Sequence, residues 1–140
     1  AGSGVSGLIF KKAGKEQLEK HTKKNYLTPM KVGEVRVTQG FNISCDILFV
    51  QGPKRYDYDT LEEALDKLVL TYKNLLNFCL ENNYKNILLP SLGTGIYGFR
   101  HEDVVEPVLK LLNDDTYKSL NINYVIYDKE VYDYYKQYLK

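Results

Sequence analysis

The stretch Asn86–Phe99, with the sequence NILLPSLGTGIYGF, constrains the fold more than any other part of the chain. Its apolar run Ile87–Leu89 is too short for a helix, so we expect a buried strand. Pro90 has no N–H to give to a sheet, and the strand should end there. Glycines that permit tight turns and close approach of a ligand follow at positions 93, 95 and 98.

Two interpretations of this glycine loop are open. It can be a structural turn whose large side chains, Ile96, Tyr97 and Phe99, enter the core. It can also be a ligand loop, because consecutive main-chain N–H groups in such a segment are able to surround an anion. Three large apolar side chains are unusual in a plain solvent loop, which favours a ligand loop that presents an aromatic ring.

Composition limits the classes of protein to consider. The chain has 140 residues and a net charge of +1, which predicts one compact domain without the basic surface that nucleic acids or membranes attract. Cys45 and Cys79 lie in apolar segments, so we expect buried free thiols and a cytoplasmic protein. His21 and His101 form no metal-binding pattern with them, and we expect neither a metal nor a cofactor.

Hydrophobic periodicity predicts alternating helices and strands. The clearest helix covers 61–80, with Thr60 and Glu63 as a capping box at its start. Asp103 is the candidate N-cap of the next helix, which places Pro107 in its first turn. The other expected elements are a helix over 4–20 interrupted near Gly14, strands at 34–38, 46–50, 87–89 and 122–127, and helices at 103–112 and 129–139, the last burying Val131, Tyr135, Tyr138 and Leu139.

This order of elements is typical of an α/β fold. Right-handed crossovers predict that the strands at 47–50, 87–89 and 122–127 are largely parallel neighbours with helices on both faces of the sheet. Ligands of such sheets bind beyond the carboxyl ends of the strands. The loops at that edge are 51–58, 91–100 and 128–129, so the glycine loop is among them.

The spacing G-x-G-x-x-G occurs twice, at positions 2, 4 and 7 and at positions 93, 95 and 98. A dinucleotide-binding fingerprint needs a strand directly before it and an acidic residue about 20 positions later, and neither match fulfils both conditions. A dehydrogenase is therefore disfavoured. Two glycine-rich turns that each lead towards a helix start could instead clamp a diphosphate between them.

These segments together resemble macrodomains, the ADP-ribose-binding modules. PSLGTGIYGF is similar to their second ligand loop, and GSGVSGLI resembles their first glycine loop. The segments around Thr38–Phe41, Ile47–Pro53 and Val125–Asp128 resemble further family segments in the same order. The resemblance covers essentially the whole chain and implies a three-layer α/β/α fold with a mixed, mostly parallel central sheet.

The resemblance also implies roles for individual residues. Main-chain N–H groups of the two loops should hold the diphosphate, Tyr97 should face the distal ribose, and Tyr127 should flank the adenine beside Asp128. We read Ser91, just before the second loop, as structural rather than catalytic. The ligand-binding residues implied are Ser3, Gly4, Val5, Ser6, Ser91, Gly93, Thr94, Gly95, Ile96, Tyr97, Gly98, Phe99, Tyr127 and Asp128.

The chain departs from the family pattern in two ways. The family's first strands and its asparagine-rich motif are absent, so we expect one N-terminally incomplete macrodomain over 1–140, its open sheet covered by a further segment or a second copy. Ser6 stands where many de-ADP-ribosylating members carry an aspartate, and serine alone is a poor general base.

Three functions are therefore compared. The first is a module that binds free ADP-ribose or ADP-ribosylated protein. The second is a hydrolase that removes mono-ADP-ribose from proteins or deacetylates O-acetyl-ADP-ribose, with unassigned catalytic residues. The third is a degenerate domain that serves as an interaction surface, and the intact glycine loops argue against it.

Overall fold

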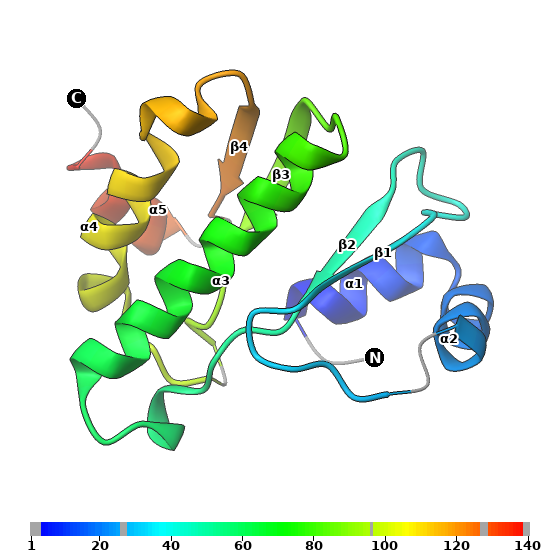
Figure 1. The fold of residues 1–140 in the computed structure, drawn as a ribbon, viewed down its shortest axis with the longest axis horizontal. Coiled ribbons are helices and arrows are strands. Elements are labelled where there is room, and N and C mark those ends of the chain that lie inside the picture. Colours follow the sequence, from blue (N-terminus) through cyan, green and yellow to red (C-terminus); the bar gives the residue numbers. More distant parts are fainter. Residues whose placement is uncertain (1–3, 26–27, 96, 127–128, 139–140) are drawn as a thin grey trace.

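The structure, a computed structural model, describes residues 4–25, 28–95, 97–126 and 129–138. Helices and strands alternate along these residues, as expected for an α/β chain (Figure 1). Two short 3₁₀ turns at Arg55–Asp57 and Asp115–Tyr117 complete the connections. The main elements are α1 (Gly4–Ala13), α2 (Lys15–Asn25), β1 (Val35–Thr38), β2 (Ile47–Val50), α3 (Leu61–Glu81), β3 (Asn86–Pro90), α4 (His101–Leu112), β4 (Asn121–Val125) and α5 (Lys129–Lys136).

Helix α3 is the longest element and carries the main core. Its apolar residues recur at helical spacing, and the Thr60 hydroxyl caps its start by accepting a hydrogen bond from the Glu63 amide at 3.2 Å. The predicted helix and cap are thereby confirmed. Its fully buried residues are Ala64, Leu68, Thr71, Tyr72, Leu76 and Cys79. They pack against residues of β1, β2, β3, β4 and α4 in one cluster, so α3 joins both strand pairs.

The strands form two pairs. β1 and β2 are antiparallel, with Val35 opposite Val50, and β3 and β4 are parallel, with Asn86 opposite Asn121. Side chains of β2 alternate: Leu48 and Val50 pack with the α3 core, and Ile47 and Phe49 pack with α1 and α2. As predicted for this short apolar strand, both faces of β2 are covered.

The expected pairing of β2 with β3 is wrong for the described residues, in which each belongs to a separate sheet. Side chains connect them instead: Tyr84, before β3, donates a hydrogen bond to Asp46, before β2. The expected cover on both faces of β3 and β4 is also wrong. Leu88 is 78% exposed because the helices pack on the opposite face, where Ile87 and Leu89 are buried. Cover of this open part of the sheet by a further segment or a second copy stays a prediction.

Helix α4 begins two residues earlier than the proposed Asp103 cap. The Arg100 carbonyl accepts hydrogen bonds from the amides of Asp103 and Val104, so the first turn forms around Arg100. Pro107 therefore lies inside the helix, where its ring nitrogen removes one intrahelical bond.

Two predictions of burial are also corrected. Tyr138 is 45% exposed because α5 ends at Lys136, whereas Tyr135 is buried as expected. Cys45 is exposed in the turn before β2, and Cys79 is buried in α3. Both thiols are free, and the cytoplasmic location inferred from them stays a prediction. No helix in the described ranges is long and apolar enough to cross a membrane.

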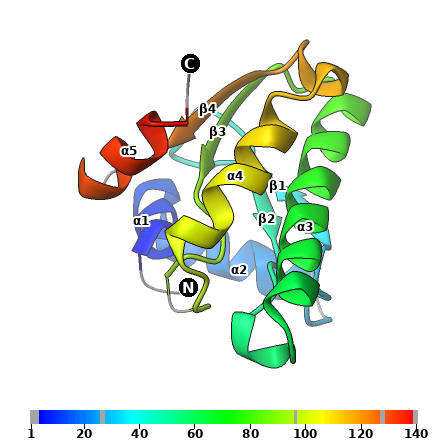
Figure 2. The ribbon, with the colours of Figure 1, turned by 90° about the vertical axis from the view of Figure 1, so that its left-hand side faces the viewer.

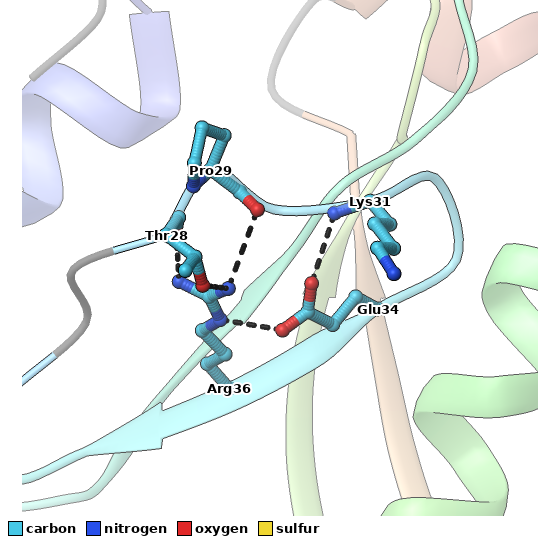
Figure 3. A network of polar contacts seen from close by, with 5 residues as sticks. All are labelled: Thr28, Pro29, Lys31, Glu34 and Arg36. Atoms are coloured by element: carbon cyan, nitrogen blue, oxygen red, sulfur yellow. Dashed lines mark hydrogen bonds and ion pairs between the residues drawn. The ribbon is translucent and has the colours of Figure 1, made fainter.

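A polar network fixes the segment that leads into β1 (Figure 3). The Arg36 guanidinium donates from Nη1 to the Thr28 carbonyl at 2.7 Å and from Nε to Glu34 at 2.5 Å. The other carboxylate oxygen of Glu34 accepts from the Lys31 amide at 2.9 Å. Hydrogen bonds from Arg36 and from the Lys31 amide hold the pKa of Glu34 below its usual value. The network closes the 28–34 loop onto the strand.

The network predicts a pH-dependent contribution to stability. Because the pKa of Glu34 is lower in the folded state, the stabilisation is present above the unfolded-state pKa of about 4.3 and is lost as pH falls through the folded-state value. Glu34→Gln should lower the melting temperature at pH 7 and have little effect at pH 3. Thermal unfolding followed by circular dichroism at both pH values measures the difference. An equal loss at both would contradict the role of the charge.

The helix cap gives a second prediction. Thr60→Ala should destabilise the protein by about 1 kcal/mol, because it removes the acceptor of the Glu63 amide. Urea denaturation measures the free energy of unfolding. Thr22→Ala is the matched control, since the Thr22 hydroxyl donates within α2, to the Glu19 carbonyl at 3.0 Å, and its loss should cost under about 0.5 kcal/mol. Equal losses in the two variants would show that Thr60 is no cap.

Candidate functional site

The glycine loop follows β3 and leads into α4, and its described residues are 91–95 and 97–100. Two backbone hydrogen bonds shape it: the Phe99 amide donates to the Gly93 carbonyl at 3.0 Å, and the Gly98 amide donates to the Gly95 carbonyl at 3.0 Å. Phe99 is 3% exposed and anchors the loop in the α3 core. The loop is thus a closed, tethered turn at the carboxyl end of a strand.

The three glycines are required for different reasons. Gly93 and Gly98 have φ values of 81° and 86°, a region that disfavours other residues. A Cβ on Gly93 would also lie 3.0 Å from the Phe99 ring. Gly95 has no such φ, and a Cβ there would meet nothing within 4 Å. The fold itself therefore does not require glycine at position 95, whereas close approach of a ligand to the backbone would.

Several amides of the loop have no partner among the residues that the structure describes. Within the described residues, the N–H groups of Gly93, Thr94, Gly95 and Tyr97 donate to no acceptor, whereas those of Leu92, Gly98 and Phe99 do. Gly95 is exposed, so its amide is open to solvent. A short run of free main-chain amides is suited to bind an anion.

The neighbouring loop 51–58 lies against the glycine loop. The Arg55 amide donates to the Tyr97 carbonyl at 2.8 Å, and Gln51 Nε2 donates to the Tyr97 hydroxyl at 3.1 Å. Lys54 Nζ lies 5.7 Å from the centre of the Tyr97 ring. Tyr97, predicted to face a ribose, is therefore held on both its carbonyl and its hydroxyl, with a cation above its ring.

The first glycine segment forms the start of a helix. Gly4, Val5 and Ser6 belong to the first turn of α1, whose amides have no intrahelical acceptor. Figures 1 and 2 both show the glycine loop and loop 51–58 at the lower end of the molecule, with the amino end of α1 above and beside the glycine loop. The two predicted ligand segments are thus at the same edge. Ser3, Ile96, Tyr127 and Asp128 lie outside the described residues.

Ser91 has a contact within the loop, and its role stays a prediction. Its hydroxyl lies 2.9 Å from that of Thr94, within the loop. No cluster of three or more His, Cys, Asp or Glu side chains in the described part of the chain could hold a metal ion. The site presents backbone amides rather than a recognisable catalytic set.

Sequence reasoning missed four residues that contact the loop. Three of them, Gln51, Lys54 and Arg55, come from loop 51–58. The sequence predicts that this loop lies at the ligand edge because it follows β2, but it does not single out these residues. Tyr72 of α3 was interpreted only as core, yet its hydroxyl accepts a hydrogen bond from the Leu92 amide at 2.6 Å. No sequence signal distinguishes this tyrosine from other core positions of α3.

Comparison with known proteins places this geometry in a family. The Macro domain family model matches residues 1–108. The O-acetyl-ADP-ribose deacetylase of Escherichia fergusonii is 31% identical over 134 aligned positions, and the match covers 92% of this chain and 75% of the relative. A Fusobacterium nucleatum protein, FN1951, is also 31% identical and is covered over 79% of its length, against 99% of this chain.

Solved structures agree with the sequence comparison. The Oceanobacillus iheyensis macrodomain with ADP superposes with a TM-score of 0.81 at 26% identity, over 99% of this chain and 76% of that one. A mutant of the same macrodomain with ADPR gives a TM-score of 0.83 at 26% identity, over 99% and 77% of the two chains. These matches confirm the predicted α/β macrodomain fold. On these grounds the chain belongs to the Macro domain family.

Proposed function

We propose that this chain binds ADP-ribose, either free or attached to a protein, between the glycine loop and the first turn of α1. The observation that carries the proposal is the set of free amides at Thr94, Gly95 and Tyr97 beside a glycine that the fold does not require. Structures of similar chains contain ADP or ADPR, which supports the choice of ligand.

The chemistry of the ligand suits these groups. A diphosphate is an extended anion, and two sets of amides at one edge can contact its two phosphates without moving. Lys54 adds a positive charge near Tyr97. At the nucleoside end we keep the prediction that Tyr127 flanks the adenine beside Asp128, where an aromatic stack contributes about 1–3 kcal/mol.

A second candidate function is hydrolysis of an ADP-ribose derivative. Relatives from Escherichia fergusonii and Pantoea vagans bear the name O-acetyl-ADP-ribose deacetylase, which favours this candidate. The two loops would stabilise the diphosphate while a bound water attacks the ester or glycosidic bond. Binding remains the primary proposal because the described residues at the site offer no assigned general base.

The proposed binding predicts that a substitution in the glycine loop can lower the affinity for ADP-ribose without lowering the stability of the fold. Isothermal titration calorimetry should detect ADP-ribose binding by the unmodified protein. Gly95→Val should weaken binding at least about 10-fold, because the added side chain occupies the approach to the free amides, and should leave the melting temperature unchanged, because its Cβ meets no protein atom within 4 Å.

Ser119→Val is the matched control. Ser119 is exposed in the turn before β4, at the opposite end of the strands from the glycine loop, so its substitution should not change affinity. The proposed function would be refuted if the folded protein releases no heat with ADP-ribose or ADP and binds no labelled ADP-ribose. Equal affinities of Gly95→Val and the unmodified protein would exclude the glycine loop as the site.

The enzymatic candidate has its own test. The protein is incubated with a mono-ADP-ribosylated protein and, separately, with O-acetyl-ADP-ribose. We expect both substrates to be lost no faster than in buffer alone, since no general base is assigned. Mass spectrometry of the protein and of the released nucleotide measures this. Release that is abolished by Gly95→Val would instead establish the chain as a hydrolase acting at the same site.

A further inference from the structure

Beneath the glycine loop lies a group of tyrosines from three different elements, two of them buried and one half-buried. Tyr72 of α3 is completely buried, and its hydroxyl lies 3.2 Å from that of Tyr124 in β4. Tyr135 of α5 is 3% exposed, and its ring centre lies 5.6 Å from that of Tyr124. None of these tyrosines is in the set predicted to contact the ligand. Their hydroxyl groups are nevertheless close to the start of the loop.

The direction of the hydrogen bond to the loop follows from the chemistry of the two groups. The Leu92 amide can only donate, so the Tyr72 oxygen accepts at 2.6 Å. The Tyr72 and Tyr124 hydroxyls lie 3.2 Å apart, and either can donate to the other. Burial raises the pKa of Tyr72 to about 12, so at neutral pH this hydroxyl keeps its proton and accepts from the Leu92 amide as a neutral group.

We infer that Tyr72 is a positioning residue for the ligand: its hydroxyl fixes the Leu92 amide and thereby the glycine loop, and Tyr124 orients that hydroxyl. The inference rests on the proposed binding of ADP-ribose. Tyr72 does not touch the ligand in this account. It acts through the loop, 20 residues further along the chain.

The hydrogen bond between Leu92 and Tyr72 affects the whole loop because it lies at the base of the loop. Leu92 is followed directly by Gly93, whose carbonyl accepts the bond from Phe99 that closes the turn. Beyond Gly93 come the free amides of Thr94, Gly95 and Tyr97. Without the Tyr72 hydroxyl, the Leu92 amide loses its partner, and these amides must be ordered when the ligand binds. Groups that are ordered beforehand bind with less loss of conformational entropy.

Another tyrosine of the same core provides a matched control. Tyr117 is also 3% exposed, and its hydroxyl donates to Asn77 Oδ1 of α3 at 2.8 Å. Tyr117 belongs to the turn before β4, at the opposite end of the strands from the glycine loop. Tyr117→Phe therefore also removes one tyrosine hydroxyl that is hydrogen-bonded in the α3 core, but it leaves the glycine loop unchanged.

Calorimetry with ADP-ribose on the whole chain separates positioning from general stabilisation. Tyr72→Phe should weaken binding about 3- to 10-fold, the equivalent of one lost hydrogen bond, and Tyr117→Phe less than about 2-fold. Both should lower the melting temperature. Tyr124→Phe, which keeps the bond to Leu92, should have an intermediate effect on affinity and serves if Tyr72→Phe does not fold. Equal affinities of the two phenylalanine variants Tyr72→Phe and Tyr117→Phe would overturn the inference.

A ligand-free measurement keeps this test separate from that of the proposed function. In nitrogen-15 NMR spectra, Tyr72→Phe should shift the amide signals of Leu92–Gly95 and accelerate their hydrogen exchange, and Tyr117→Phe should leave them in place. Unchanged loop amides in Tyr72→Phe would refute positioning even if the protein binds ADP-ribose. Absence of binding by the unmodified protein, together with shifted loop amides, would refute the ligand and not the role of Tyr72 in the loop.

Discussion

Contact of α3 with both strand pairs is the constraint on which the rest of the structure depends. In the described residues no backbone ladder joins β2 to β3, so burial of side chains from both strands on one helix sets their relative position. Leu48 and Val50 of β2 and Ile87 and Leu89 of β3 all pack in the α3 core. Full burial of such a side chain contributes about 1.5–3 kcal/mol, but hydrophobic burial has no direction.

Directional contacts are therefore needed to orient the two sheets. They lie at the two ends of β2: Tyr84 bonds to Asp46 before the strand, and Gln51 bonds to Tyr97 after it. The second contact is part of the candidate site. The geometry of the glycine loop relative to loop 51–58 thus depends on the same side chains that orient the two sheets, and function and architecture share one set of contacts.

The fold could be predicted from the sequence where local patterns coincide with tertiary packing. α3 follows from its apolar period and Thr60, and the glycine loop follows from Pro90 and its glycines. The predicted start of α4 is wrong because Asp103 is a good capping residue by type, whereas in the fold the Arg100 carbonyl accepts the first helical bonds. Pairing of β2 with β3 was inferred from handedness alone, and handedness does not reveal which strand lies beside which.

The site was predictable in location and only partly in composition. Glycine spacing identified the loop, but free amides are a property of the folded backbone and leave no mark in the sequence. Nor does the contact of Tyr72 with Leu92, because a tyrosine at a helical core position looks the same whether its hydroxyl meets an amide or a void. A contact between residues 20 positions apart can be identified only from the structure, which shows α3 packed against the loop.

The exposed face of β3 has a consequence for the behaviour of the protein at high concentration. Leu88 projects into solvent from a strand that has one hydrogen-bonded neighbour among the described residues, β4. An unpaired strand edge beside exposed apolar side chains is a template on which a strand of another molecule can add. Two features oppose such growth. The hydrogen-bonded side chains of Asn86 and Asn121 make the start of the strand pair polar. Pro90, at the end of β3, has no N–H to donate to an added strand. Colloidal stability of this chain thus depends on the strand that carries its glycine loop.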